Sequence, residues 1–313
     1  MALWVVHSIR LTHATTPVIL GGLTQVGVPQ GVDIAADIVS GGPYPPVVYT
    51  RSKRPTLTFT SKNIEQLLRL SGVTSLAVKT GGTYTGIEVI FAQLDDCGRI
   101  ASGSVHRKLA YDFGCLFPRT LSVSSGQDAE ITYEFIALSS DGATSPTTLA
   151  GSQALPTLPS QDRYAMHALN LTGSIAVGDK TQLSVDFGIT ANSLQLEDGV
   201  YPKLLSVDQQ IPRLTFTSHD VTRFDSSAIA EGGLVLAHAS SELWFRQRKL
   251  DADVLEALTA EKHILFTVAG IAHVEDITGS GNTPAALSGV ITGSYDGTNA
   301  PFTFSYDQPI QET

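Results

Sequence analysis

Residues 42–61 read GPYPPVVYTRSKRPTLTFTS and residues 199–218 read GVYPKLLSVDQQIPRLTFTS, and this repeated stretch decides the fold. Aligned without a gap, at a constant offset of 157 residues, the two stretches agree at nine of twenty positions. Unrelated segments agree at about one or two positions in twenty, so self-similarity at a fixed period is a strong signal. The shared positions are Gly42/Gly199, Tyr44/Tyr201, Pro45/Pro202, Pro55/Pro212, Leu57/Leu214, Thr58/Thr215, Phe59/Phe216, Thr60/Thr217 and Ser61/Ser218.

The offset is half of the 313-residue chain, which predicts two copies of one domain. Each copy is long enough to bury a core of its own. We expect the first copy over residues 1–145, a linker rich in Pro, Ser and Thr over 146–162, and the second copy over 163–313. Two equivalent units in one chain suit a symmetric assembly.

Strand patterns dominate both halves. In the repeated stretch, polar and apolar residues alternate, so that Leu57 and Phe59, and likewise Leu214 and Phe216, point toward a core. Further strands are expected at 86–93, 130–139, 234–239, 242–248, 263–274, 287–294 and 301–306. The sequence therefore predicts a mainly β (α+β) fold with two tandem antiparallel β-sandwich or barrel-type domains, each with a short flanking helix.

Three short helices are expected. Ser61 is a suitable N-cap for a helix over 62–70, and Ser218 is the matching cap for a weaker segment containing Val221 and Phe224. The stretch 251–262 (DADVLEALTAEK) carries apolar residues at helical spacing, which predicts a helix with no counterpart in the first half.

Charge is sparse and unevenly distributed. Only 16% of the residues are charged and the net charge is −10; residues 1–156 carry 11 basic and 11 acidic side chains, and residues 157–313 carry 9 and 19. A chain without a basic cluster cannot displace the counterions of nucleic acid, which argues against tight binding to it. No signal peptide and no apolar stretch of ~18 residues is evident, so we expect no membrane contact and synthesis in a reducing cytoplasm.

We find no catalytic constellation, and we expect no enzyme, no cofactor and no metal. The Walker, HExxH, GxSxG and Rossmann patterns are all missing, and the eight histidines are scattered. Cys97 and Cys115 lack the spacing of a zinc site or a disulfide framework and are expected to be plain thiols.

The Tyr-Pro pairs Tyr44-Pro45 and Tyr201-Pro202 precede the repeated strands. A polyproline ligand is one interpretation of the first pair, but the second copy retains only one of the prolines. A turn that presents a tyrosine at equivalent places of an interface fits both copies better.

Several of these segments resemble the tail tube (major tail) proteins of long-tailed bacteriophages. The resemblance rests on LTFTSKNIEQLL and LTFTSHDV, on the recurring RKL at 107–109 and 248–250, on GCLFP at 114–118, and on the SSDG turn at 139–142 followed by a proline. It implies small domains of antiparallel sheets that assemble into rings, and rings that stack into a hollow tube. In members with two fused domains, three chains make a pseudo-sixfold ring. The second copy departs from the family by lacking a clear counterpart of GCLFP.

The resemblance implies a structural virion protein, made in the cytoplasm of the bacterial host and located in the phage tail. Its partners would be further copies of itself, the tape measure, distal tail and terminator proteins, and DNA only as non-specific passing cargo. In this family a long hairpin commonly reaches the neighbouring ring. The candidate segments are 37–54 and 194–211, with Tyr44, Pro45, Tyr201 and Pro202 as contacts; an ordinary surface loop is the competing interpretation.

Two other functions compete with the structural one. A non-enzymatic tandem β-sandwich that binds carbohydrate or a cell surface is compatible with the strands, but it predicts more aromatic residues than the 7% present. A hydrolase with an unrecognised site is disfavoured because no nucleophile is paired with a base.

Overall fold

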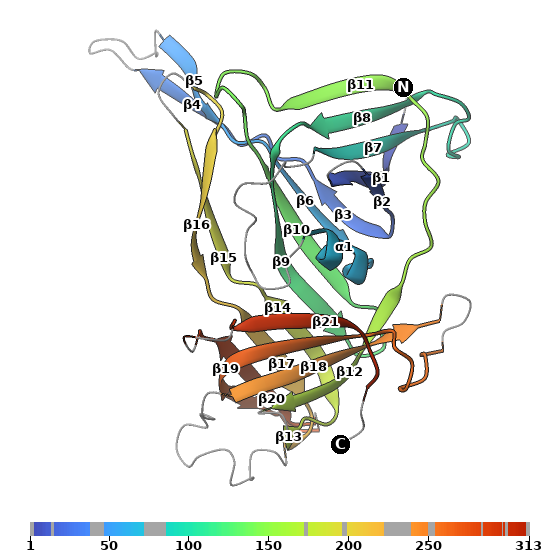
Figure 1. Cartoon of the computed structure of the whole chain (residues 1–313), viewed down its shortest axis with the longest axis vertical. Coiled ribbons are helices and arrows are strands. Elements are labelled where there is room, and N and C mark those ends of the chain that lie inside the picture. Colours follow the sequence, from blue (N-terminus) through green and yellow to red (C-terminus); the bar gives the residue numbers. More distant parts are fainter. Residues whose placement is uncertain are drawn as a thin grey trace.

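The computed structural model describes residues 3–13, 16–37, 47–71, 86–171, 175–195, 199–221, 239–249, 254–282, 284–295, 297 and 300–310. Over these residues the chain is almost entirely antiparallel β-structure with one α-helix, which confirms the expected mainly β fold. The first half of the chain lies above the second half in Figure 1, and a single sheet runs through both.

The first half is a sandwich of two sheets. Their strands are β1 (Leu3–His13), β2 (Thr16–Leu20), β3 (Leu23–Gly27), β6 (Thr56–Ser61), β7 (Ile87–Leu94), β8 (His106–Tyr111), β9 (Gly114–Ser124), β10 (Glu130–Ala137) and β11 (Thr147–Gln153). One sheet has the order β11-β8-β7-β1-β2, and the other runs β9-β10-β6-β3. β11 occupies the first part of the expected linker; residues 154–162 that follow form no regular element.

The second half continues the same chain of strand pairings. Its strands are β12 (Arg163–Leu171), β13 (Ile175–Ala176), β14 (Lys180–Asp186), β17 (Arg213–Ser218), β18 (Ala239–Arg248), β19 (His263–Thr278), β20 (Ala286–Gly293) and β21 (Phe302–Gln308). The order β13-β12-β18-β19-β20-β17-β14 leads directly onto β9, and β21 pairs with β19. Within the described residues this makes one 12-stranded sheet that crosses from half to half.

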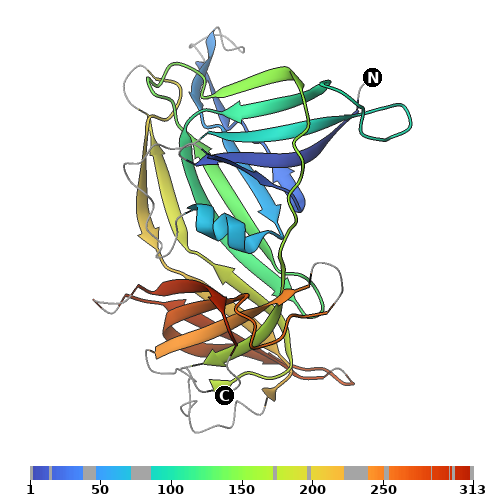
Figure 2. The same ribbon diagram turned by 45° about the vertical axis from the view of Figure 1, so that its right-hand side comes forward.

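Two hairpins extend from the halves. The first consists of β4 (Val32–Asp37) and β5 (Val47–Lys53), and the second of β15 (Ile189–Leu194) and β16 (Leu204–Gln210). Figures 1 and 2 show β15–β16 leaving the second half and running alongside the first half. The segments expected to hold long hairpins, 37–54 and 194–211, therefore overlap two hairpins of the same topology.

The strand pairings of the first half recur in the second half in the same order. The correspondence holds strand by strand: β1 and β2 match β12 and β13, β3–β6 match β14–β17, β7 matches β18, β10 matches β20 and β11 matches β21. Each of the eight pairings within the first half therefore has a counterpart within the second half. The long strand β19 takes the place of both β8 and β9. The structural repeat thus extends well beyond the short stretch of sequence that first suggested it.

The repeated strands lie at the centre of each core. Leu57, Phe59, Leu214 and Phe216 are all buried, because alternate residues of β6 and β17 face the interior. The ring of Phe59 stacks on Tyr133 with 5.9 Å between centroids. Burial of each such aromatic or aliphatic side chain contributes about 1.5–3 kcal/mol.

Of the three predicted helices, one is observed, one is wrong and one lies outside the described residues. Helix α1 (Ile64–Ser71) lies close to the expected position, with Leu67 and Leu68 buried against the core. The helix expected at 251–262 is wrong over its described part, 254–262. Glu256 N–H bonds to Gln247 O at 2.9 Å and Leu255 pairs with Arg248, so the start of the segment pairs with the end of β18, and the rest forms a turn. The segment after Val221, expected to be a weak helix, lies outside the described residues.

Candidate assembly interface

Ser61 and Ser218 are the last residues of β6 and β17, and we call these two equivalent strand ends the serine corners. The Ser61 hydroxyl donates to the carbonyl oxygen of Gly21 at 3.2 Å and accepts from the N–H of Asn63 at 3.1 Å. Ser218 repeats both bonds with Gly178 O, at 2.6 Å, and with Asp220 N–H, at 2.9 Å. All three pairs of positions keep the offset of the sequence repeat, so the hydrogen bonds recur with the same period. Because α1 begins at Ile64, Ser61 supports the residue that precedes the helix.

A glycine stands at the base of each hairpin. Gly31 has φ 53° and accepts from Arg54 N–H at 3.0 Å, and Gly188 has φ 60° and accepts from Ile211 N–H at 3.1 Å. These positive φ values favour glycine. A Cβ at Gly188 would also collide with the backbone of Ile211. In both hairpins, therefore, the chain entering the hairpin passes close to the chain leaving it, at a glycine.

The two halves join through β9 and β14. These strands pair antiparallel, with Leu121 opposite Val185. Arg119, at a bulge of β9, forms an ion pair with Glu134 and donates a hydrogen bond to the carbonyl oxygen of Ile189, the first residue of β15. Strand pairing and a charge-assisted bond thus fix the second hairpin against the first half.

The tip of the second hairpin is packed on the first half. Tyr201 N–H donates to Gly142 O at 2.9 Å, and Ser139 N–H donates to Pro202 O at 2.8 Å. The Tyr201 ring lies under the ammonium group of Lys53, 5.6 Å away, and its side chain is only 8% exposed. Tyr201 and Pro202 therefore make a contact inside this chain.

Their first-half counterparts, Tyr44 and Pro45, lie outside the described residues. Every predicted site residue of the second copy, in contrast, is buried in the chain or bonded to its other half. Sequence patterns could not identify this arrangement, because no local signal indicates that a hairpin of one copy rests on the other copy.

Asp128, in the turn between β9 and β10, is a charge hub between the halves. Its carboxylate lies 2.8 Å from Arg248 Nε and 3.6 Å from both Lys62 Nζ and Arg163 Nη1. Lys62 belongs to the first half and the two arginines to the second. One carboxylate that faces three cations attracts all of them, and its side chain is only 11% exposed, which limits screening.

A second polar group joins α1 to the second half. The Tyr164 hydroxyl donates to Glu65, and burial is the main cause that raises the pKa of Tyr164 above its ordinary value. Arg69 bonds to Asp307 at 2.6 Å and lies over the ring of Tyr306, 4.3 Å from its centroid. These contacts hold the helix between both halves.

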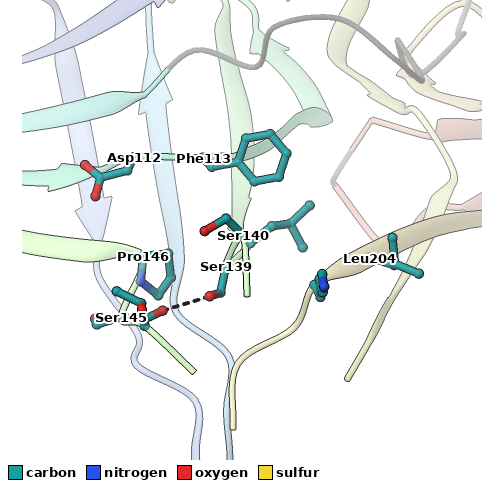
Figure 3. A pocket seen from close by; sticks show the side chains of 10 residues that line it. Asp112, Phe113, Ser139, Ser140, Ser145, Pro146 and Leu204 are labelled. Atoms are coloured by element: carbon teal, nitrogen blue, oxygen red, sulfur yellow. Dashed lines mark hydrogen bonds between the residues drawn. The ribbon is translucent and has the colours of Figure 1, made fainter. Parts of the chain in front are cut away.

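A cavity of about 460 Å³ lies where the SSDG turn meets the second hairpin (Figure 3). Its lining is mainly apolar, with Phe113 and Pro146 on one side and Leu204 on the other. Within the turn, Thr144 and neighbouring amides donate to Asp141 and hold its pKa below the usual range. The Ser139 hydroxyl, which lines the cavity, donates to the Asp141 carboxylate at 2.9 Å and to Thr144 O at 2.8 Å, so its hydrogen bonds stay within the turn.

Other kinds of site find little support in the part of the chain that the structure describes. No group of three or more His, Cys, Asp or Glu side chains there could hold a metal ion. No described helix has the length and hydropathy to cross a lipid bilayer. Cys97 is exposed and Cys115 is buried, and neither forms a disulfide within the described residues.

Comparisons with known proteins add no family. A scan against protein-family models finds no match, and a search of curated proteins finds none either.

Proposed function

We propose that this protein is a structural virion protein, a phage tail tube subunit that assembles into rings and stacks them into a hollow tube. The observation that carries the proposal is the edge-to-edge union of two topologically repeated halves through β9 and β14. A chain that already joins two copies of a unit by their sheet edges is suited to add further units in the same way.

The sheet edges that stay unpaired within the chain also support this proposal. An open sheet whose terminal strands stay unpaired is a template for pairing with another chain, and closure of a ring removes such edges. Three copies, as the resemblance implies, would form a pseudo-sixfold ring from alternating first and second halves. Since the halves differ in charge, the ring would be threefold by composition and sixfold only in fold.

Net charge suits a tube for DNA. At −10 per chain, three chains would carry −30 in one ring. Acidic residues that face the lumen would repel DNA phosphates within about 8–10 Å at physiological salt, so that DNA passes without binding. The tape measure, distal tail and terminator proteins would be its neighbours in the virion.

Electron microscopy of the purified protein tests the proposal. Rings or hollow tubes of uniform diameter are the expected result as the protein concentration rises. Monodisperse monomers at every concentration and salt would refute it and would leave the carbohydrate-binding or cell-surface β-sandwich as the better hypothesis. Sedimentation velocity on the same samples distinguishes ordered assembly from aggregation, because only assembly produces discrete species.

A further inference from the structure

We propose that β3 and the β4–β5 hairpin of one copy dock on β19 of a second copy, in the register that joins β14 and the β15–β16 hairpin to β9 within one chain. This inference deepens the proposed function, on which it rests, by naming the two surfaces and their alignment. Its occupant is a second copy of this chain.

The two surfaces are equivalent to the two that already meet inside the chain. β3 corresponds to β14, as both pair with the repeated strands β6 and β17. The later part of β19 corresponds to β9, because β19 pairs with β20 as β9 pairs with β10. Both strands carry a bulge at the same place relative to these partners, at Arg119 in β9 and at Glu275 in β19.

The first hairpin exposes the positions that the second hairpin buries. Ile189 and Ala191 of β15 are 7% and 8% exposed, because β15 rests on the first half. The matching residues of β4, Val32 and Ile34, are 48% and 61% exposed. The same face of the same motif is thus covered in one copy and uncovered in the other.

The complementary surface shows the same contrast. Leu121 and Cys115 of β9 are 1% and 5% exposed. Their counterparts on β19, Ile277 and Ile271, are 40% and 42% exposed. Apolar residues at equivalent positions are therefore buried on β15 and β9, which lie at the joint between the halves, and exposed on β4 and β19, where a second copy would cover them.

Both edges are also open for strand pairing. Among the described strands, β3 pairs only with β6, and the stretch 271–278 of β19 pairs only with β20. Each therefore has one row of backbone N–H and C=O groups without a partner among those strands. Pairing with another copy would satisfy these groups.

The register between two copies is obtained by applying the internal register of β14 on β9 to the equivalent residues of β3 and β19. Inside the chain, Gln182 stands opposite Ser124 and Val185 stands opposite Leu121. The sequence repeat maps the two β14 residues onto Gln25 and Val28. The matching bulges map the two β9 residues onto Ser280 and Ile277. Gln25 of one copy should therefore stand opposite Ser280 of the second copy, and Val28 opposite Ile277. The contact is head-to-tail, so it continues until a ring closes.

One difference weakens the contact between copies relative to the internal one. Arg119 donates to Ile189 O inside the chain, but Glu275 occupies the corresponding place of β19 and forms an ion pair with Arg213. A carboxylate cannot donate to the carbonyl oxygen of Val32. We therefore expect assembly to depend on protein concentration.

Disulfide trapping between two singly substituted chains tests the register. In a Cys97→Ser background, a chain with Gln25→Cys is mixed with one carrying Ser280→Cys; Val28→Cys with Ile277→Cys forms a second mixture. These two opposed pairs are of opposite hydrogen-bonding class in an antiparallel ladder, so one of them has the closer Cα spacing of about 4.5 Å. Gln25→Cys mixed with Ile271→Cys is the out-of-register control.

The expected result is a covalent dimer on a non-reducing gel, formed at least tenfold faster in a register pair than in the control. Ile34→Asp should abolish this dimer, whereas Leu149→Asp, at a similarly exposed position on β11, should leave it unchanged. Equal rates in all mixtures, or no dimer in either register pair, overturn the inference.

Electron microscopy of the unoxidised mixtures separates this inference from the proposed function. Rings or tubes without the expected disulfide would overturn the docking surfaces and leave the tube intact. The disulfide without rings or tubes would support the docking surfaces and refute the tube.

Discussion

Asp128 offers the sharpest test of how the two halves are held together. We expect Asp128→Asn to lower the free energy of unfolding by about 2 kcal/mol. Arg248 Nε and Asp128 Oδ1 form an ion pair at 2.8 Å with both side chains largely buried, and removal of one partner of a buried pair costs about 3–5 kcal/mol. Lys62 and Arg163, at 3.6 Å and about one-third exposed, add only about 0.2–1 kcal/mol each. Asparagine keeps a polar group beside Arg248 and neither side chain is fully buried, so the expected loss stays below that range.

The assay is urea unfolding at concentrations where sedimentation shows a monomer. The chain has two tryptophans, Trp4 in the first half and Trp244 in the second, so Trp4→Phe and Trp244→Phe variants report each half separately by fluorescence. With a denaturant slope of about 2–3 kcal/mol/M, the midpoint should fall by about 0.7–1 M. Both probes should register the loss, because Asp128 contacts both halves.

A double-mutant cycle supplies the control. Arg248→Met removes the guanidinium and keeps an apolar stem, and its coupling energy with Asp128→Asn should be about 1–2 kcal/mol. At 1 M NaCl, where the Debye length is about 3 Å, the part of this difference that comes from the more exposed Lys62 and Arg163 should shrink, whereas the part from the buried Arg248 pair should remain. A loss below about 0.5 kcal/mol, or a coupling energy of zero, would refute the assignment of Asp128 as the hub between the halves.

Two further predictions concern the repeated corner and a buried histidine. Ser61→Ala and Ser218→Ala should each cost about 1–3 kcal/mol in urea unfolding, because each removes both hydrogen bonds of a buried hydroxyl; a neutral effect at either site would contradict the equivalence of the corners. Burial lowers the pKa of His263, whose Nδ1 accepts from Gln247 N–H at 3.2 Å. The unfolded chain then binds more protons below the ordinary pKa of about 6.5, so stability is full above that pH and falls as the pH drops toward the lowered pKa. Thermal unfolding between pH 7.5 and 5.5 should show this decline, and His263→Gln should flatten it; an unchanged slope in the variant would show that other groups cause it.

Local sequence predicted the features that depend on near neighbours. The alternation around Leu57 and Phe59 indicated half-buried strands, and the pattern after Ser61 placed α1 close to its observed start. The helical spacing was misleading at 254–262, where Val254 and Leu255 pair with the end of β18 and Leu258 O accepts from Ile310 N–H. Tertiary pairing satisfied the backbone there and overrode the local preference.

The candidate interface was predictable only in part. Sequence identified the segments of both hairpins and the equivalence of their Tyr-Pro turns. It did not indicate that Tyr201 is buried against the first half, nor that Ile34 and Ile277 are left exposed, because these facts depend on which copy covers which.

By itself, the sequence determined that the chain is built of β-strands and repeats itself at about half its length, since alternation and self-similarity are properties of order along the chain. Only the tertiary structure decided how the two copies join and which of their edges remain open. The two halves share a strand pattern, yet burial depends on what lies across the sheet edge. For β14 that neighbour is β9, which is distant in sequence. For β3 we propose that it is β19 of another molecule.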